Sequence, residues 1–259
     1  MKILSTTFLA LFTGLTVSSA NGAVIFYDDM ESYPLGNDQD VSSSPKLYLD
    51  FGIADQTTAT PFGSPNQFAF LDGGSSFSRV NSVSTLMTYS FDMYEPTTAQ
   101  TGPTRFGLGQ GDVNSNAYAA WSIDNGVLTT LDNTSPVSGS LPTLEQDRHY
   151  TAYIVHNGSD GPEVVDGTGL TLQAGETSLY FYDTVTSSLI DAGVYSHSGS
   201  KLATSFLVRS FGADDNTLYY DNITQLNTLT VIPEPSAYAG ILGGAVLLCM
   251  LRRRSMKAK

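Results

Sequence analysis

YAAWSIDNGVLTTL, residues 118–131, consists of two apolar runs joined by Asp124-Asn125-Gly126. Asn and Gly both tolerate the positive φ angles of a two-residue hairpin turn, so this stretch predicts two antiparallel strands and a tight turn. No apolar period of 3.6 residues runs through it, which argues against a helix. The same alternation of short strand-like runs with turn-forming clusters recurs along the chain and predicts an all-β fold.

A series of segments shares the alternating or aromatic-rich pattern of strands, and clusters of Gly, Asn, Asp, Ser and Pro separate them. Because no helical segment comes between them, they predict a two-sheet antiparallel sandwich of the jelly-roll type. The predicted strands are residues 23–27, 67–71, 86–94, 104–108, 118–123, 126–131, 150–156, 178–182, 205–211 and 217–225.

The composition is strongly acidic, with 25 Asp and Glu residues against 12 Lys and Arg residues in a chain of 259. Six of the basic residues and one acidic residue lie in the two terminal segments, so the central part carries a net charge of about −18. Such a surface repels nucleic acid, which excludes it as a partner. The single cysteine, Cys249, lies near the C-terminus, so the central part has no disulfide.

The N-terminus has the pattern of a secretory signal peptide. Lys2 supplies the positive start, residues 3–17 form an apolar core, and Ser18-Ser19-Ala20 is a small-residue cleavage site. Cleavage after Ala20 and cleavage after Ala23 both fit this pattern, and a buried N-terminal helix is the alternative. We therefore expect residues 1–23 to direct export.

The C-terminus combines three features in order. Pro233-Glu234-Pro235 interrupts any helix, residues 237–251 form an apolar helix, and Arg252-Arg253-Arg254 gives that helix a cationic end. This combination resembles the PEP-CTERM sorting signal of Gram-negative bacteria. The resemblance implies recognition by an envelope protease of the exosortase type, which cuts near the tripeptide. A simple membrane anchor and a chance apolar tail are the alternatives, and about 15 apolar residues make a short span.

Both ends of the chain indicate one topology. Arginines stay on the cytoplasmic side of a membrane helix, which places the preceding chain outside. We expect a signal peptide over residues 1–23, a β-sandwich domain over 24–230 and a sorting signal over 231–259. The expected location is the cell envelope or the extracellular space, with transient or permanent anchoring in the inner membrane and a cytoplasmic C-terminus.

The two ends of the central part resemble a known sandwich family. Residues 25–36, IFYDDMESYPLG, are similar to the opening strand and turn of concanavalin A-like lectin/glucanase (laminin-G-like) sandwiches. Residues 218–223, LYYDNI, are similar to the closing strand of those proteins. The resemblance implies that the first and last strands are neighbours.

Neighbouring terminal strands would gather carboxylates, and hard oxygen ligands of this kind favour Ca²⁺. We expect such an ion to be structural and to clamp the termini, with solvated acidic residues that protect a sheet edge as the alternative. A second calcium candidate, residues 112–116 (DVNSN), departs from an EF-hand loop at Ala117, so we interpret it as an Asx-rich turn. The candidate ligands at the termini are Asp28, Asp29, Glu31 and Asp221.

Catalytic signals are sparse. Concanavalin-like glucanases carry the pattern Glu-x-Asp-x-x-Glu on one strand, so that two carboxyl groups flank a glycosidic bond. Glu145-Gln146-Asp147 begins in this way, but no third carboxylate follows, and Pro142 indicates a loop. We interpret His149, His156 and His197 as scattered surface residues, since an odd spacing puts the first two on opposite faces of a strand. We therefore expect the protein not to be an enzyme.

A sugar-binding role would need exposed aromatic rings. Trp121 falls on the apolar face of its strand, which predicts a core position, whereas Tyr118 falls on the opposite face. Tyr180 and Tyr182 alternate with two apolar residues, so one of these two pairs faces away from the core. We take Tyr118, Tyr180 and Tyr182 as the candidate ligand-binding residues.

The predicted function is that of an exported, non-catalytic protein that binds or scaffolds extracellular polysaccharide. The PEP-CTERM resemblance implies this, because that family tends to accompany exopolysaccharide production. A glycan-acting hydrolase or lyase of the concanavalin-like class is the first alternative, and a purely structural surface protein is the second. The expected partners are the exosortase-type protease, extracellular polysaccharide and, through the C-terminal helix, the membrane. Apart from Ca²⁺, no cofactor is expected.

Replacement of Pro233-Glu234-Pro235 by three alanines should block processing of the tail, because the resemblance assigns recognition to this tripeptide. We expect an unprocessed form that stays in the membrane fraction, detected by cell fractionation and intact-mass measurement. Identical fractionation and mass for the variant and the parent protein would contradict the sorting role.

Overall fold

The computed structural model describes residues 22–55, 61–62, 66–71, 77–81, 83–97, 102–109, 117–131, 134–197, 202–210 and 218–231. Every regular element within these ranges is a β-strand, which confirms the all-β prediction. None of these residues forms a helix with the length and apolarity needed to cross a membrane. The core of the predicted signal peptide, the Pro-Glu-Pro motif and the apolar segment after it lie outside the described residues.

The strands of the described ranges are numbered in chain order. They are β1 (Val24–Asp28), β2 (Gly36–Ser43), β3 (Lys46–Asp55), β4 (Gln67–Leu71), β5 (Phe77–Asn81), β6 (Leu86–Tyr94), β7 (Thr104–Gly109), β8 (Ala117–Asp124), β9 (Val127–Thr130), β10 (Thr134–Ser138), β11 (His149–Asn157), β12 (Glu163–Val164), β13 (Thr171–Leu172), β14 (Thr177–Asp183), β15 (Ser188–His197), β16 (Ser205–Ser210) and β17 (Tyr219–Leu226).

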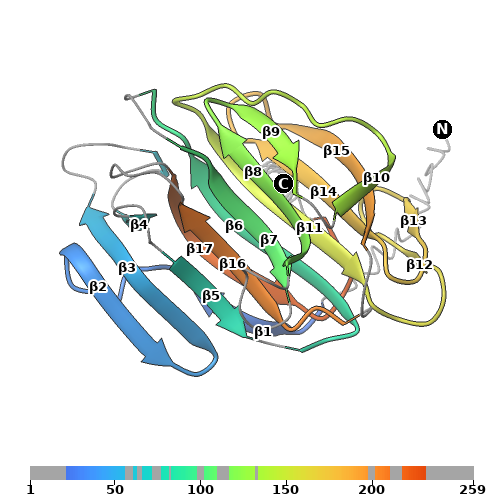
Figure 1. Ribbon diagram of the computed structural model, residues 1–259, viewed down its shortest axis with the longest axis horizontal. Coiled ribbons are helices and arrows are strands. Elements are labelled where there is room, and N and C mark those ends of the chain that lie inside the picture. Colours follow the sequence, from blue (N-terminus) through green and yellow to red (C-terminus); the bar gives the residue numbers. More distant parts are fainter. Residues whose placement is uncertain are drawn as a thin grey trace, which may run out of the picture.

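Two layers of antiparallel strands lie one behind the other (Figure 1). The first layer has the order β10-β15-β14-β11-β6-β17, and β1 pairs with β17. The second layer has the order β3-β5-β16-β7-β8-β9, and β2 pairs with β3. β4 pairs with both β17 and β3, so the two layers belong to one hydrogen-bonded sheet of 15 strands. β12 and β13 form a separate pair.

The main core lies between the two layers. Alternation along β6 points Tyr89 and Phe91 inward, and both side chains are fully buried. The Tyr89 ring stacks on Phe206 of β16 with the centroids 5.0 Å apart, which joins the layers. Trp121 is fully buried and stacks on Phe106, so its predicted core position is confirmed. Each buried aromatic side chain contributes about 2–3 kcal/mol by removal of apolar surface from water.

A smaller apolar cluster covers one end of the outer face of the first layer. Leu172 of β13 and Val165, which follows β12, belong to it, together with Leu229 and Val231 of the segment after β17. On the sheet itself, Tyr180 of β14 belongs to the same cluster. The β12–β13 pair is therefore held against the sheet by apolar contact, and it leaves the other end of this outer face uncovered by the cluster.

The antiparallel sandwich is confirmed in its broad form. The expected pair of sheets is instead one sheet whose two layers are continuous through β4, because β4 bonds to strands of both layers. The jelly-roll connectivity and the concanavalin-like assignment stay predictions. The expectation that the first and last strands are neighbours is confirmed, since Asp28 of β1 is paired with Ile223 of β17.

Sequence pattern found some strands and missed others. The predicted ranges 67–71 and 86–94 agree with β4 and β6 to the residue. β2 was missed because its sequence, GNDQDVSS, reads as a turn, and its register against β3 shifts twice. β15 was missed because Gly193, with a φ of 104°, interrupts its apolar run. The other missed strands are β3, β5, β10, β12 and β13.

Gly107 of β7 lies where the backbone of β8 comes closest. Its φ is +155°, and an added Cβ would lie 2.3 Å from the Ala119 carbonyl oxygen and 2.6 Å from the Ala120 Cα. These are backbone atoms that cannot move aside, so Gly107→Ala should lower the free energy of unfolding by about 2–3 kcal/mol. Chemical denaturation checks this, with Gly161→Ala as the control because an added Cβ there meets nothing within 4 Å. Equal stability of the two variants would contradict the close packing.

Candidate functional site

The outer face of the first layer carries rows of polar side chains. Core residues occupy the alternate positions of β6, so Ser90 and Asp92 of this strand lie on the outer face. Strand register places Asp92 beside Thr151 of β11 and Asp221 of β17. It places Ser90 beside Tyr153 of β11. Three neighbouring strands therefore build one polar floor.

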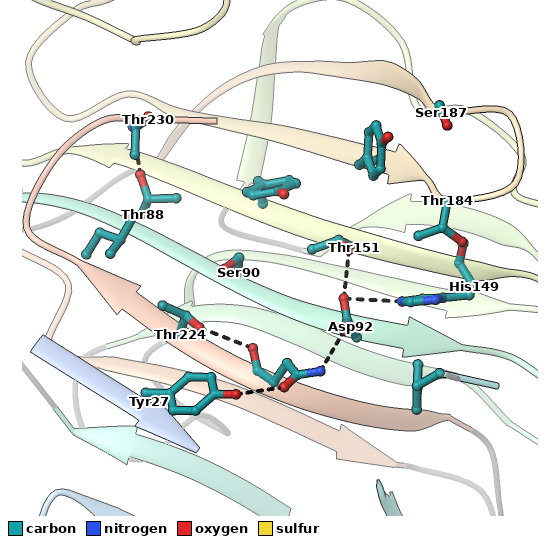
Figure 2. A pocket seen from close by; sticks show the side chains of 15 residues that line it. Tyr27, Thr88, Ser90, Asp92, His149, Thr151, Thr184, Ser187, Thr224 and Thr230 are labelled. Atoms are coloured by element: carbon teal, nitrogen blue, oxygen red, sulfur yellow. Dashed lines mark hydrogen bonds and ion pairs between the residues drawn. The ribbon is translucent and has the colours of Figure 1, made fainter. Parts of the chain in front are cut away.

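A groove of about 670 Å³ lies over this floor (Figure 2). Aromatic rings and short hydroxyl side chains make up most of its lining, and one carboxylate is present among the described residues that line it. The aromatic residues are Tyr27, Phe62, Tyr153 and Tyr182; the hydroxyl residues are Thr88, Ser90, Thr151, Thr184, Ser187, Thr224 and Thr230; and Asp92, His149, Asn222 and Leu226 complete the lining.

Asp92 is the centre of the polar network in the groove. Its Oδ1 accepts a hydrogen bond from Thr151 Oγ1 at 2.7 Å and lies 3.3 Å from His149 Nε2. Its Oδ2 accepts a hydrogen bond from Asn222 Nδ2 at 2.9 Å. The His149 ring packs edge-on against Phe62, with the centroids 5.0 Å apart. Figure 2 shows Thr151, His149 and Asp92 directed toward one another. The carboxylate is thereby held in one orientation.

Asn222 links this network to a fully buried carboxyl group. It has a φ of 50° at a bulge of β17, a conformation that Asn adopts more readily than most residues. Its Nδ2 also lies 3.2 Å from Asp221 Oδ2, so one amide group bonds to two carboxyl groups. Its Oδ1 accepts a hydrogen bond from the Tyr27 hydroxyl at 3.0 Å. The bulge therefore sets the position of three functional groups.

Asp221 lies beside Asp92 on the neighbouring strand β17 and is fully buried. Asn66 Nδ2 and the backbone N–H of Asn222 donate to it at 2.6 and 2.7 Å. Burial is the main reason that its pKa is raised to about 7, and the neighbouring carboxylates of Asp92 and Glu31 raise it further against the effect of these hydrogen bonds. A fully buried carboxyl group with a raised pKa therefore lies beside the groove carboxylate Asp92.

The acidic residues at the termini have other partners in the structure. Asp28 Oδ2 accepts from Lys46 Nζ at 3.0 Å, Tyr33 Oη at 2.8 Å and Tyr48 Oη at 3.2 Å. Glu31 Oε1 accepts from a backbone N–H at 2.7 Å. Within the described ranges, no group of three or more His, Cys, Asp or Glu side chains could hold a metal ion. An ammonium group thus lies at Asp28, and the calcium clamp stays a prediction.

The three tyrosines predicted to bind a ligand differ in their positions in the structure. Tyr180 and Tyr182 both lie outside the main core. This agrees with the expectation that one of the two alternating pairs of this strand faces away from the core. Both belong to the smaller cluster and are buried, with Tyr180 2% and Tyr182 5% exposed, but only Tyr182 lines the groove. Burial raises the pKa of the Tyr180 hydroxyl. The side chain of Tyr118 lies outside what the structure describes, and so do residues 112–116 of the second calcium candidate.

The interpretation of the histidines as scattered surface residues is wrong. His149 lines the groove, and His156 is fully buried on the other face of β11, with its Nδ1 2.9 Å from Thr177 Oγ1. The His156 and His197 rings are 6.0 Å apart, and burial together with His156 lowers the pKa of His197 to about 4. The odd spacing did separate His149 from His156, but their strand lies in the middle of its layer, so His156 is buried on the core face and His149 lies in the groove.

The acidic motif Glu145-Gln146-Asp147 lies in a loop, as Pro142 indicated. Asp147 accepts from Thr97 Oγ1 at 2.5 Å, and Arg148 forms an ion pair with Glu145 and a second one with Asp183 at 2.5 Å. These contacts tie loops to the end of the sheet, and none of these residues lines the groove.

Asp92, Asn222 and the groove position of His149 were missed by the sequence reasoning. A signal was present for one of them: Thr88, Ser90 and Asp92 alternate with apolar residues along β6. A strand with one apolar face and one face of small polar residues indicates a solvent-facing polar surface. The local sequence around Asn222 does not predict a bulge.

Comparisons with known proteins complete the description. No protein-family model and no curated protein matches the chain. A Trypanosoma rangeli sialidase in complex with 2,3-difluorosialic acid is similar, with 13% identity and a TM-score of 0.47, over 82% of this chain and 31% of the sialidase. The carbohydrate-binding module CBM66 from Bacillus subtilis has 13% identity and a TM-score of 0.39, over 74% of this chain and 99% of the module.

A GH43 protein from Bacillus licheniformis is also similar, with 8% identity and a TM-score of 0.42, over 77% of this chain and 39% of that protein. The chain spans about a third of the length of the sialidase chains it matches. At such low identities and with TM-scores below 0.5, these likenesses decide neither the ligand nor the reaction of this chain.

The prediction that the protein is not an enzyme is withdrawn, because sialidases and a GH43 protein stand among the similar structures. That prediction rested on the lack of paired carboxylates along one strand. That criterion considers one strand only, whereas the groove brings Asp92 of β6 and His149 of β11 together from different strands. No pattern within one strand can show such an arrangement.

Asp221→Asn should remove part of the pH dependence of stability. Because the pKa of Asp221 is raised to about 7 in the folded protein, its ionisation opposes folding as the pH rises from about 4 toward 7. The free energy of unfolding should fall by roughly 2–4 kcal/mol over this range through this group, and much less in the variant. Denaturation at pH 5 and pH 8 checks this, with Asp124→Asn of the β8–β9 turn as the control. Parallel pH curves for the parent protein and Asp221→Asn would contradict the assignment.

Proposed function

We propose that the groove on the outer face of β6, β11 and β17 binds an extracellular polysaccharide. The observation that carries the proposal is the fixed carboxylate of Asp92 at the centre of a groove lined by hydroxyl groups and aromatic rings. Sugars present hydroxyl groups that need acceptors and donors, and C–H faces that pack on aromatic rings. The groove supplies both kinds of contact.

The polar groups of the floor are prepared for such a ligand. Thr151 and Asn222 hold the Asp92 carboxylate through hydrogen bonds of 2.7 and 2.9 Å, so its orientation costs little entropy on binding. Tyr27 is 55% exposed, and the hydrogen bond of its hydroxyl to Asn222 fixes the orientation of its ring. It is more exposed than Tyr153 and Tyr182, the other tyrosines that line the groove. The volume of about 670 Å³ lies within the range of ordinary ligand sites.

Glycan hydrolysis is a second candidate function. Asp92 lies 3.3 Å from His149 in the groove, and Asn222 bridges Asp92 to Asp221, whose pKa is about 7. A carboxyl group whose pKa is raised toward neutral pH, as that of Asp221 is, favours acid–base chemistry on a glycosidic bond. In this proposal Asp92 is the carboxylate that faces the scissile bond, and Asn222 and His149 position it.

The sorting signal and the family resemblance belong to the same proposal. Export through the N-terminal signal, recognition of Pro233-Glu234-Pro235 by an exosortase-type protease, and anchoring through residues 237–251 would bring the groove to the outer side of the inner membrane or beyond it. A concanavalin A-like jelly roll is the finer fold assignment that goes with this function. A purely structural surface protein is the alternative if no glycan binds.

Binding is tested with the purified full chain on a panel of polysaccharides, by affinity electrophoresis and calorimetry. We expect saturable binding to one sugar class, and Tyr27→Ala should weaken it about tenfold, because a stacked ring contributes on the order of 1 kcal/mol. Val127→Ala, at a side chain that is 51% exposed on the other layer, is the control. A parent protein that binds no polysaccharide would contradict the proposal.

Hydrolysis is tested by incubation of the same panel with the full chain and measurement of new reducing ends. We expect Asp92→Asn to lower any rate by at least about a hundredfold, since loss of an acid–base group costs that much. An unchanged rate of cleavage by Asp92→Asn would contradict the role of Asp92 in hydrolysis. Binding without new reducing ends would contradict the second candidate and leave the first.

A further inference from the structure

The central part has few basic residues, and the described ones lie outside the lining of the groove. Lys46 pairs with Asp28 at 3.0 Å, and Arg148 pairs with Glu145 and Asp183. Neither basic side chain lines the groove. The remaining basic residues of the central part are Arg79, Arg105, Lys201 and Arg209, of which Lys201 lies outside the described residues.

The three arginines of the second layer face away from the sandwich core. Arg209 of β16 follows the core residue Val208, and its register partner Arg105 of β7 precedes the core residue Phe106. Arg79 of β5 precedes the core residue Val80 in the same way. Alternation therefore puts all three on the outer face of the second layer. The sandwich separates them from the groove, which lies on the outer face of the first layer.

The charge within the groove has the opposite sign. Asp92 lies on the floor, and Asp221 is its fully buried neighbour on β17. Asp29 lies two residues after the groove residue Tyr27, whereas Asp28 is buried and paired with Lys46. Burial is the main cause that raises the pKa of the Tyr27 hydroxyl, and the neighbouring carboxylates, Asp29 first among them, raise it further. With Asp92 on the floor and Asp29 close to Tyr27 in the chain, the field in the groove is negative. A negative group in a ligand would meet this field with no described Lys or Arg side chain to pair with.

We propose that the groove selects uncharged sugars and rejects sugars that carry a carboxylate or a sulfate group. The inference rests on the proposed glycan binding and adds the substrate class. Two contributions act together. The net charge of about −18 repels an anionic polymer at long range, and salt screens this repulsion. Asp92 repels an anionic ring locally, where screening is weaker because the ligand displaces water.

The test compares neutral polysaccharides with their charged counterparts on the full chain. The pairs are methyl-esterified pectin against polygalacturonate, xylan against glucuronoxylan, and dextran against dextran sulfate, each at 0.05 and 0.5 M NaCl. We expect the charged member of a bound pair to bind at least about tenfold more weakly at low salt, and part of this gap to survive at high salt. Equal or tighter binding of the charged members would overturn the inference while leaving the proposed function.

Variants separate the two contributions. Asp92→Asn should narrow the gap between neutral and charged members, and Ser90→Lys, which places a cation on the floor, should move the preference toward the charged members. Asp124→Asn, in a turn of the second layer, removes one charge elsewhere and should leave the gap unchanged. Selection by the groove would be contradicted if the difference in affinity between neutral and charged polysaccharides vanished at high salt and stayed unchanged in both groove variants. Binding of no glycan at all would contradict the proposed function, and the selectivity with it.

Discussion

Strict alternation of side chains along β6 and β11 is the constraint on which the rest of the structure depends. In β11, Ala152 and Ile154 enter the core, whereas Thr151 and Tyr153 face the groove. Because the period of a strand is two residues, a shift of the register by one residue would exchange core and groove. The apolar contacts between the layers therefore fix the positions of the polar side chains as well as those of the core. Because Phe91 is buried in the core, the next residue, Asp92, lies on the other face, in contact with Thr151, His149 and Asn222.

The bulge at Asn222 adds what regular alternation cannot supply. A regular strand would continue to alternate beyond Asp221, whereas the bulge brings Asp221 and Asn222 into contact with the same network. Such a conformation costs of order 1–3 kcal/mol, and strained residues of this kind gather at functional sites. Here the bulge joins a groove carboxylate, a buried carboxyl group with a pKa near 7 and an exposed tyrosine. The site is thus built from backbone irregularity as well as from side-chain chemistry.

The sequence predicted the parts of the fold that depend on local pattern. β6 was found in full because Met87, Tyr89 and Phe91 alternate with polar residues, and Trp121 was placed correctly by the same rule. The parts that depend on distant pairing could not be predicted. The contact of Thr151 with Asp92 joins residues 59 positions apart, and the contact of Asn222 with Asp92 joins residues 130 apart. Local propensity carries no information on which strands become neighbours, so the groove and the partners of Asp28 and Asp221 emerged only from the structure.

The central claim is that the outer face of β6, β11 and β17 is where a glycan binds. The most direct measurement is an NMR titration of the isotope-labelled protein with a neutral oligosaccharide, followed through the backbone amides. The account predicts that the largest shift changes fall on groove positions such as Ser90, Thr151 and Asn222, while amides around Arg79 and Arg209 on the opposite layer stay unchanged. Changes confined to the opposite layer, or saturating binding with no change at the groove, would contradict the account.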